Sequence, residues 1–207
     1  MFRDRGDAGK RLAESLARAG VVFDIVIGIP RGGVAVAKEI AGHFKCPMDV
    51  VMARKIGSPT NEEYAIGAVT PDGKIFVDER VQEFLGFDHE RIQLEARRVQ
   101  REINRRIARY RSGKPGPDLA AKRVLLVDDG IATGFTIKAA VAYLRQQGAS
   151  YIAIAVPVAA REAVQELEPM VDDFFSLEVP EKFYAVGQFY EDFSPVDDEA
   201  VIEMLND

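Results

Sequence analysis

Apolar residues follow two alternating patterns along this chain of 207 residues. Short continuous apolar runs rich in β-branched residues are typical of buried parallel strands, and apolar residues that recur every three or four positions are typical of amphipathic helices. The runs predict strands at residues 23–29, 48–53, 124–127, 151–156 and 173–178. The periodic segments predict helices at residues 10–19, 34–44, 135–147, 161–168 and 196–205. This alternation predicts an α/β fold in which helices flank a twisted, mostly parallel sheet.

Residues 88–111 predict one long, arginine-rich helix of about 36 Å, since each helical residue adds about 1.5 Å. Its apolar stripe consists of Ile92, Ala96, Val99, Ile103, Ile107 and Tyr110. The other faces carry arginines, with Glu95 and Glu102 spaced to pair with some of them. Two interpretations stay open: a solvated helix packed on the core, or a contact face that attracts an anion or makes the protein a homodimer.

A polar stretch at residues 54–73 interrupts the alternation and contains many turn-forming residues. It has little capacity to form a core, so we expect a mobile loop, because long loops inside compact domains are usually functional or disordered. At its end, residues 65–69 and 74–78 can pair as a hairpin across the turn at 70–73.

Composition narrows the classes of function. A chain of this length is one domain, which we take to span residues 1–207. The net charge of −6 argues against nucleic-acid binding, which needs a basic surface. Cys46 is the single cysteine, and the sequence lacks both a membrane-length apolar run and the apolar segment of a signal peptide. We therefore expect a cytoplasmic protein with no membrane partner.

The strongest chemical signal is a buried apolar run that ends in Asp128 and Asp129 and continues into a loop rich in Gly and Thr. Small residues, hydroxyls and a helix start suit a phosphate. Two adjacent carboxylates suit hydroxyls or a cation instead, so a ribose 5-phosphate satisfies both halves. The structural alternative is that one of the carboxylates merely caps the next helix.

The stretch VLLVDDGIATGFT, residues 124–136, closely resembles the phosphoribosyl diphosphate signature of the type I phosphoribosyltransferases. The resemblance implies that Asp128 and Asp129 hold the ribose hydroxyls with Mg²⁺ nearby. It implies that the loop binds the 5-phosphate through Gly130, Ile131, Ala132, Thr133, Gly134 and Thr136. The 6-oxopurine branch of the family usually has an Asp at the position of Ala132, so no base-catalyst role is implied here.

The segment Gly28–Gly33 is a second candidate loop, although a plain strand-to-helix turn would also explain it. In the type I family the loop at this place binds pyrophosphate, which would make Arg31, Gly32 and Gly33 its ligands. The family often has a non-proline cis peptide there, so we expect one between Pro30 and Arg31.

Two further segments complete the resemblance. Arg54 and Lys55 would act as catalytic cations on the leaving pyrophosphate, at the start of a lid that excludes water. Residues 179–195 resemble the small C-terminal hood of the hypoxanthine-guanine branch, with Phe183 or Tyr184 stacking on the base and Asp192 reaching Mg²⁺ through water. The structural alternative is that these aromatics cover a sheet edge. The chain also lacks the lysine which that branch keeps near residues 158–160.

The resemblance implies a Mg²⁺-dependent phosphoribosyltransferase that joins phosphoribosyl diphosphate to a nitrogenous base, a purine or a related base, and releases pyrophosphate. The alternative from another class is a non-catalytic sensor of phosphoribosyl diphosphate that regulates a partner. A phosphorylated receiver domain also has acidic strand ends, but it lacks the phosphate loop behind them.

Overall fold

A five-stranded sheet forms the centre of the molecule, with strand order β2-β1-β6-β7-β8. The computed structural model describes residues 1–58, 61–77 and 89–206. The strands are β1 (Ile25–Gly28), β2 (Met48–Val50), β6 (Arg123–Val127), β7 (Tyr151–Val158) and β8 (Asp173–Glu178). All neighbouring strands in this sheet pair in parallel, which confirms the predicted α/β architecture.

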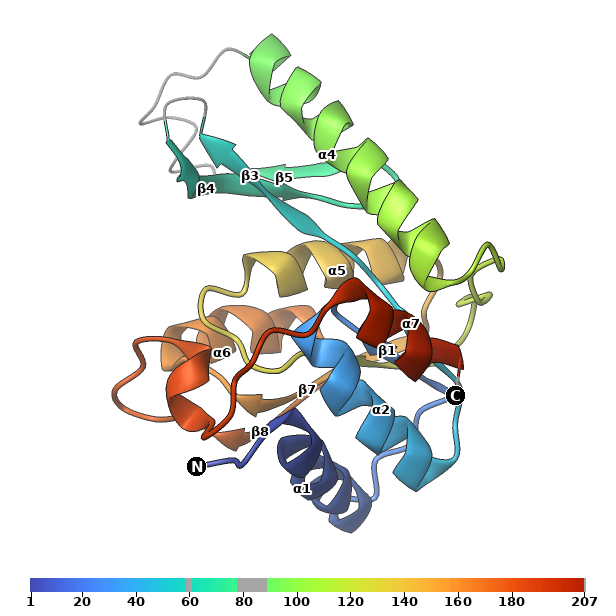
Figure 1. Ribbon diagram of the computed structural model, residues 1–207, viewed down its shortest axis with the longest axis vertical. Coiled ribbons are helices and arrows are strands. Elements are labelled where there is room, and N and C mark those ends of the chain that lie inside the picture. Colours follow the sequence, from blue (N-terminus) through green and yellow to red (C-terminus); the bar gives the residue numbers. More distant parts are fainter. Residues whose placement is uncertain (59–60, 78–88, 207) are drawn as a thin grey trace.

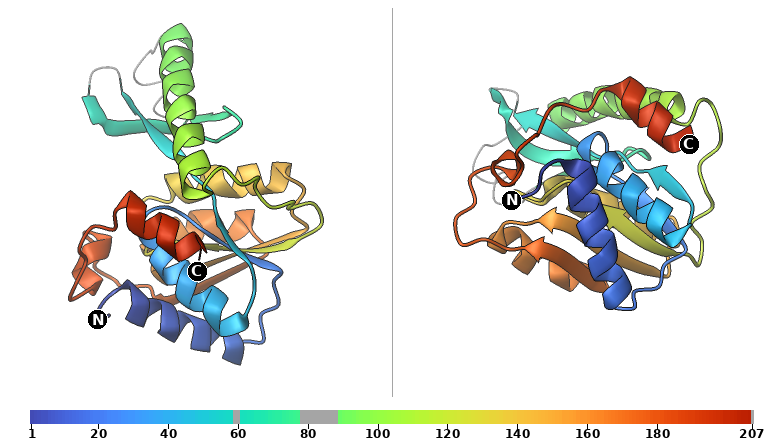
Figure 2. Two further views of the ribbon diagram at one scale, coloured as in Figure 1. Left: turned by 45° about the vertical axis from the view of Figure 1, so that its right-hand side comes forward. Right: turned by 60° about the horizontal axis from the view of Figure 1, so that its bottom comes forward.

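Helices cover both faces of this sheet, as Figure 2 shows. The helices α1 (Arg5–Arg18) and α2 (Gly32–Phe44) pack on one face, and α5 (Phe135–Gln146) and α6 (Arg161–Leu167) on the other. Alternate strand residues point to opposite faces, so Leu125 contacts the α1/α2 layer while Leu126 contacts the α5/α6 layer. The strands are therefore apolar at successive positions of the sequence, because both of their faces are buried.

The first helix begins at Arg5, five residues before the predicted start. Asp4 is its N-cap, and a carboxylate oxygen of Asp4 accepts a hydrogen bond from the backbone amide of Asp7 at 2.7 Å. The early start matters for function because it fixes the place of Arg5 relative to the rest of the molecule.

A second, antiparallel sheet and the long helix rise above the main sheet in Figure 1. The strands are β3 (Arg54–Ser58), β4 (Asn61–Val69) and β5 (Ile75–Val77), and the helix is α4 (His89–Tyr110). The hairpin of β4 and β5 and the long helix confirm two predictions. The strand β3 and residues 61–64 of β4 correct the expectation that this part of 54–73 forms a loop. Residues 59, 60, 78 and 88 of the predicted segments lie outside the described residues, and mobility of the loop stays a prediction.

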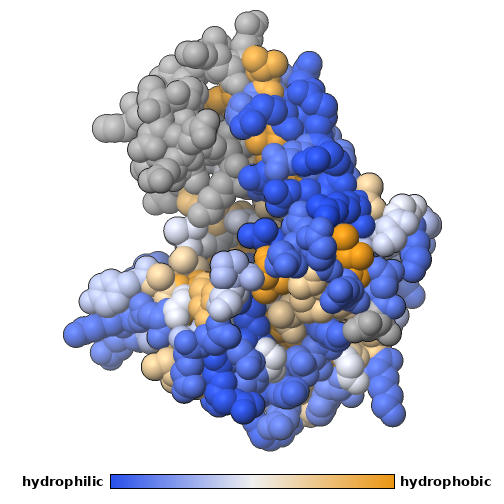
Figure 3. Space-filling model, in the orientation of Figure 1, coloured by the Kyte–Doolittle hydropathy of each residue, from blue (hydrophilic) through white to orange (hydrophobic). Residues whose placement is uncertain are grey.

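Apolar packing joins the second sheet and α4 to the rest of the molecule. Val69 and Met52 join one core cluster with the apolar stripe of α4, and Ala68 packs with Ala139 of α5. All six predicted stripe residues of α4 are buried. The opposite face of α4 carries exposed arginines, and Figure 3 shows mostly hydrophilic colour there. Within the described residues, no helix combines the length and apolar character needed to cross a membrane.

The chain ends by crossing back over the sheet. After β8 come the short helical turn η2 (Val186–Phe189) and the final helix α7 (Asp198–Asn206). The backbone of Phe2 pairs with this tail: its amide donates to the carbonyl of Phe189 at 2.7 Å, and its carbonyl accepts from the amide of Glu191 at 2.8 Å. The N-terminal residues thus pair with the tail segment that follows η2, next to Leu177 of β8.

Candidate ligand site at the ends of β1 and β6

The loops that follow β1 and β6 lie next to each other at the carboxyl edge of the main sheet. The register pairs Gly28 with Val127, so both strands end at the same level. The chain runs from β1 outward to β2 and from β6 outward to β7 and β8, so the strand order reverses between β1 and β6. Ligands of open α/β sheets bind at such a reversal.

The loop after β6 surrounds a cavity of about 170 Å³, lined by residues 130–137 together with Asp128 and Val186. Ile131 fixes the loop to β7, since its amide donates to the carbonyl of Val158 at 2.9 Å. Gly134 is the N-cap of α5 with a φ of 74°, a left-handed conformation that favours glycine. The helix start has no side-chain cap, so its amides and the positive end of the helix dipole are available to an anion.

This arrangement rules out the interpretation in which Asp128 or Asp129 merely caps α5, because Gly134 occupies the cap position. Thr133 is exposed and Thr136 is half-buried in the lining of the cavity. The predicted phosphate-binding residues, from Gly130 to Thr136, are therefore gathered around one hollow.

The glycines of the loop after β1 contact the acidic pair directly. A Cβ atom on Gly32 would lie 1.8 Å from Oδ2 of Asp129, and a Cβ on Gly33 would lie 2.8 Å from Cα of Asp128. A Cβ at position 33 would meet backbone atoms, and a Cβ at position 32 would have to displace the Asp129 carboxylate. The peptide bond between Pro30 and Arg31 is cis, which confirms the prediction made from the sequence. The two loops predicted to bind the two ends of one ligand are in contact.

Arg31 stands at the start of α2 with its side chain half-exposed and ion-paired to the final helix. Its Nη1 lies 3.9 Å from Oδ1 of Asp198. Asp198 also accepts a hydrogen bond of 2.7 Å from the hydroxyl of Tyr110 and pairs with Arg109 at 3.4 Å. One carboxylate of α7 thus links the predicted pyrophosphate loop to the C-terminal end of α4.

The two carboxylates of the acidic pair have different surroundings. Oδ1 of Asp128 accepts a hydrogen bond of 2.8 Å from the backbone amide of Asp129. Burial, together with the neighbouring carboxylate of Asp129, raises the pKa of Asp128 well above its usual range. Asp129 instead has a cationic partner that the sequence did not reveal: Nε of Arg5 donates to its Oδ2 at 2.7 Å. The two residues are 124 positions apart, so no local pattern could have found this pair.

The tail contributes Val186 and Tyr190 rather than the predicted aromatics. Val186 lines the cavity, and the hydroxyl of Tyr190 donates to the backbone carbonyl of Asp129 at 2.6 Å. Burial and the nearby Asp129 carboxylate raise the pKa of Tyr190. Phe183 packs on the core, whereas Tyr184 is 84% exposed. Base stacking by Phe183 or Tyr184 stays a prediction, and Phe189 with Tyr190 fits the alternative of aromatics covering the edge strand β8.

Asp192 is not brought into a metal cluster with the acidic pair. Its Oδ1 accepts a hydrogen bond of 2.9 Å from the amide of Ser194, and the Ser194 hydroxyl and amide together lower the pKa of Asp192. Across residues 1–58, 61–77 and 89–206, no three His, Cys, Asp or Glu residues are grouped as a metal site. A role for Asp192 through a bridging water stays a prediction.

Arg54 and Lys55, the predicted catalytic cations, are the first two residues of β3. Arg54 forms an ion pair with Glu102 of α4, and its side chain is 38% exposed. The backbone of Lys55 pairs with that of Ala68 across the antiparallel sheet. Because the preceding Ala53 packs with Ala139 of α5, this strand start stands over the helix that follows the phosphate loop.

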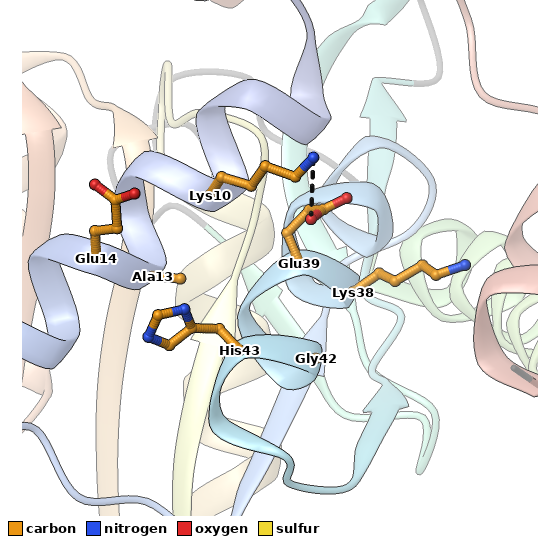
Figure 4. A pocket seen from close by; sticks show the side chains of 7 residues that line it. All are labelled: Lys10, Ala13, Glu14, Lys38, Glu39, Gly42 and His43. Atoms are coloured by element: carbon orange, nitrogen blue, oxygen red, sulfur yellow. Dashed lines mark ion pairs between the residues drawn. The ribbon is translucent and has the colours of Figure 1, made fainter.

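A larger groove of about 440 Å³ lies elsewhere, between α1 and α2 (Figure 4). Its charged side chains come from both helices, and Lys10 pairs with Glu39 across it at 3.9 Å. The groove mixes acids and bases with small residues and lacks the convergent glycines, hydroxyls and helix start of the smaller cavity. Chemistry rather than size therefore selects the cavity at the ends of β1 and β6.

Comparison with known proteins shows which family the chain belongs to. The family model described as "Phosphoribosyl transferase domain" matches residues 3–194. A Mycobacterium tuberculosis protein that carries the family's name is 37% identical over 206 residues, which cover 100% of this chain and 46% of that protein. The chain thus spans about half the length of the curated relatives it matches.

Solved structures give the same result for the fold. The crystal structure of TT1426 from Thermus thermophilus is 40% identical, with a TM-score of 0.84 over 99% of this chain and 97% of that one. A purine phosphoribosyltransferase from Pyrococcus horikoshii shares the fold at 18% identity, with a TM-score of 0.50 over 95% of this chain and 97% of that one. This chain belongs to the phosphoribosyl transferase domain family.

Proposed function

We propose that this protein is a Mg²⁺-dependent phosphoribosyltransferase that transfers ribose 5-phosphate from phosphoribosyl diphosphate to a purine or a related base. The observation that carries the proposal is the contact between the two loops at the sheet edge, where Gly32 and Gly33 lie against Asp129 and Asp128. A phosphate at the loop of α5 and a diphosphate at the loop of α2 would be the two ends of one ligand, with its ribose over the acidic pair.

In this reaction the bond from ribose C1 to the pyrophosphate oxygen breaks, and a bond from C1 to a base nitrogen forms. The chain would contribute mainly by positioning and electrostatics. The amides at the start of α5 would hold the 5-phosphate, and Arg31 would meet the diphosphate after leaving Asp198. Arg54 and Lys55 would neutralise the charge that develops on the leaving group.

The donor set fits Mg²⁺ delivered together with the substrate. Mg²⁺ usually binds one or two carboxylates plus substrate phosphates rather than an all-protein cage. Asp128 and Asp129 offer hard oxygen ligands of this kind, and the described residues hold no third acid beside them. When bound, the ion would neutralise the charge of the diphosphate.

The acceptor base would lie under the C-terminal tail. Val186 reaches over the phosphate loop, and the tail around it is rich in aromatic side chains that suit a planar base. Phe183 and Tyr184 are the candidates for stacking. A uracil phosphoribosyltransferase of Lactobacillus gasseri is 39% identical over 80 residues, which cover 37% of this chain, so pyrimidines belong in any test.

A turnover assay tests the proposal. Purified protein is incubated with Mg²⁺, phosphoribosyl diphosphate and, one at a time, purines, pyrimidines and small aromatic acids, while released pyrophosphate is measured. Release that depends on one added base supports the enzyme. The double variant Asp128→Asn with Asp129→Asn should lose phosphoribosyl diphosphate binding and keep its circular dichroism spectrum; unchanged affinity contradicts the ribose assignment.

One observation favours the alternative of a non-catalytic phosphoribosyl diphosphate sensor. Both arginines assigned to the diphosphate are held by carboxylates of other helices, Arg31 by Asp198 and Arg54 by Glu102. A ligand that captured these arginines would break their ion pairs with α4 and α7, which is a way to signal to a partner. Saturable binding without turnover for any base supports this alternative.

A further inference from the structure

The hydroxyl of Tyr190 ties the C-terminal tail to the point where the acidic pair passes into the loop of residues 130–136. It donates a hydrogen bond of 2.6 Å to the backbone carbonyl of Asp129. Tyr190 is 5% exposed, and burial followed by the carboxylate of Asp129 raises its pKa, so the hydroxyl keeps its proton and stays a donor. Because a trans peptide unit is planar, holding the Asp129 carbonyl also fixes the direction of the Gly130 amide.

The middle of this loop has few bonds of its own. Ile131 is fixed to the neighbouring chain, since its amide donates to the carbonyl of Val158 at 2.9 Å and its carbonyl accepts from the amide of Ala160 at 2.8 Å. Ala132 and Thr133 are exposed, and across residues 1–58, 61–77 and 89–206 their amides have no hydrogen-bond partner. The position of these two residues therefore depends on how the ends of the loop are held.

The tail holds the first end of the loop at two successive residues. Tyr190 bonds the carbonyl of Asp129, and Val186 packs on Gly130. The packing is close, because a Cβ on Gly130 would lie 2.5 Å from Cγ1 of Val186. A displacement of the tail would therefore move the start of the loop with it.

The N-terminal segment in turn holds Tyr190. Phe2 is 1% exposed, and its ring centroid lies 5.4 Å from that of Tyr190. The backbone of Phe2 pairs with Phe189 and Glu191, the residues on either side of Tyr190. A chain of contacts thus runs from Phe2 through Tyr190 to the first peptide of the loop.

We propose that Tyr190 is a positioning residue that keeps the loop of residues 130–136 in the conformation that binds the ribose 5-phosphate end of phosphoribosyl diphosphate, with Phe2 holding Tyr190 in place. This inference rests on the proposed function, because it concerns the same site. Asp128 and Asp129 both keep their proposed contacts with the ribose. The Tyr190 hydroxyl bonds the backbone rather than the ligand, so it raises affinity only by preorganising the loop.

Calorimetric titrations of Tyr190→Phe test the proposal, because this change removes the hydroxyl and keeps the buried ring. The probes are Mg²⁺–phosphoribosyl diphosphate, ribose 5-phosphate and Mg²⁺–pyrophosphate. We expect the first two to bind about tenfold more weakly, the size of effect when one hydrogen bond no longer favours the binding conformation. Pyrophosphate, which is assigned to the loop after β1, should bind within about twofold of its wild-type affinity, as expected for an independent site.

Tyr151→Phe is the matched control. Its hydroxyl also donates a hydrogen bond, to the carboxylate of Asp173, but Tyr151 begins β7 at the opposite edge of the sheet. We expect it to bind all three probes as the wild type does. A merely structural role for Tyr190 would lower the melting temperature of Tyr190→Phe and leave all three affinities of the folded protein unchanged.

Phe2→Leu tests the second link of the chain, since it keeps an apolar side chain while loosening the contact with the Tyr190 ring. It should reproduce the pattern of Tyr190→Phe with a smaller loss. In the Tyr190→Phe background it should add little, because the two residues act along one chain of contacts.

The outcomes separate this inference from the proposed function. If the wild type shows no saturable binding of phosphoribosyl diphosphate, both fail. If the wild type binds it and Tyr190→Phe binds it equally well, or if Tyr190→Phe weakens pyrophosphate binding just as much, the inference alone is overturned. Should Tyr190→Phe not fold, Phe2→Leu decides through the same titrations.

Discussion

The sheet edge that forms the site and the region of α4 with β3–β5 are held together in different ways. At the sheet edge the backbone of Gly33 lies against Asp128 with no room for a Cβ atom. The charged pair of Arg5 and Asp129 in the same place is nearly buried. The region of α4 has an apolar stripe inside and half-exposed ion pairs outside, such as Arg54 with Glu102. The first region tolerates no added atom, whereas the second depends on apolar contact area and little on its charges.

The difference teaches where function and stability are separable. Substitutions inside the stripe of α4 should cost stability without reaching the ligand loops. Substitutions at the glycines of the sheet edge should disturb both, because those glycines touch the residues proposed to bind ligand. Surface charges on α4 should matter least, since exposed ion pairs are screened by solvent.

The largest expected effect on stability is that of Ile103→Ala in the middle of the α4 stripe. Ile103 is fully buried, and truncating such a side chain typically costs about 2–5 kcal/mol of unfolding free energy. Leu94→Ala is the matched control on the same helix, because Leu94 is 72% exposed. Chemical denaturation measures the stability and calorimetry the affinity for phosphoribosyl diphosphate. A large loss of affinity in folded Ile103→Ala protein would break the separation between the two regions.

Gly32→Ala should affect both properties. The new Cβ must displace the Asp129 carboxylate, and overpacking of this kind costs about 1–3 kcal/mol. Displacing the site by about 1 Å can reduce function on the order of a hundredfold, so we expect a loss of binding of that size. Gly42→Ala in the same helix is the control: a Cβ there meets nothing within 4 Å, and the change should stabilise the helix by about 0.5–1 kcal/mol. Equal affinity of Gly32→Ala and wild type would contradict the tight fit.

Much of the sheet edge was predictable from sequence because its signals are local. The run that ends in Asp128 and Asp129 and the loop to Thr136 each lie within a few neighbouring residues, whereas the cis bond before Arg31 was expected from the resemblance to a known family. The order of strands and helices follows from apolar periodicity in the same way. These predictions need no knowledge of which distant segments meet.

What the sequence could not reveal depends on contacts between distant segments. Arg5 meets Asp129 across 124 positions, and Arg31 meets Asp198 of α7, a helix whose position next to the loop after β1 no local pattern predicts. The strand β3 and residues 61–64 of β4 are mostly polar, so a local pattern predicted a loop there; the two strands contact α4 and α5. Asp4 as a helix cap was the one local signal that would have placed Arg5 at the start of α1.

Tyr110→Phe should have a smaller effect at the point where the two regions meet. The lost hydrogen bond to Asp198 is typically worth about 1 kcal/mol. Burial, then the hydrogen bond to Asp198, raises the pKa of Tyr110 to about 12. The unfolded chain, with a tyrosine pKa of about 10, therefore loses this proton first, so the stability from the neutral form is present below pH 10 and falls as pH rises toward 12.

The wild type should therefore lose stability more steeply between pH 10 and 12 than Tyr110→Phe does, as measured by denaturation at fixed pH values. Tyr151→Phe is a useful control because the pKa of Tyr151 is also raised to about 12, by burial and then Asp173, at a site far from α4. Parallel curves for wild type and Tyr110→Phe would show that the hydroxyl does not join α4 to α7.

The smallest expected effect is that of Glu102→Gln, which removes the charge paired with Arg54 and, at 3.4 Å, with Arg106. Half-exposed ion pairs contribute about 1 kcal/mol or less after screening, so unfolding free energy should change by less than about 1 kcal/mol. Glu95→Gln, which removes the charge paired with Arg98 on the same helix, is the matched control. If Arg54 must leave Glu102 to meet the leaving pyrophosphate, Glu102→Gln should also raise kcat while Glu95→Gln leaves it unchanged. A loss of several kcal/mol in Glu102→Gln would mean that charge, and not the apolar stripe, holds α4 in place.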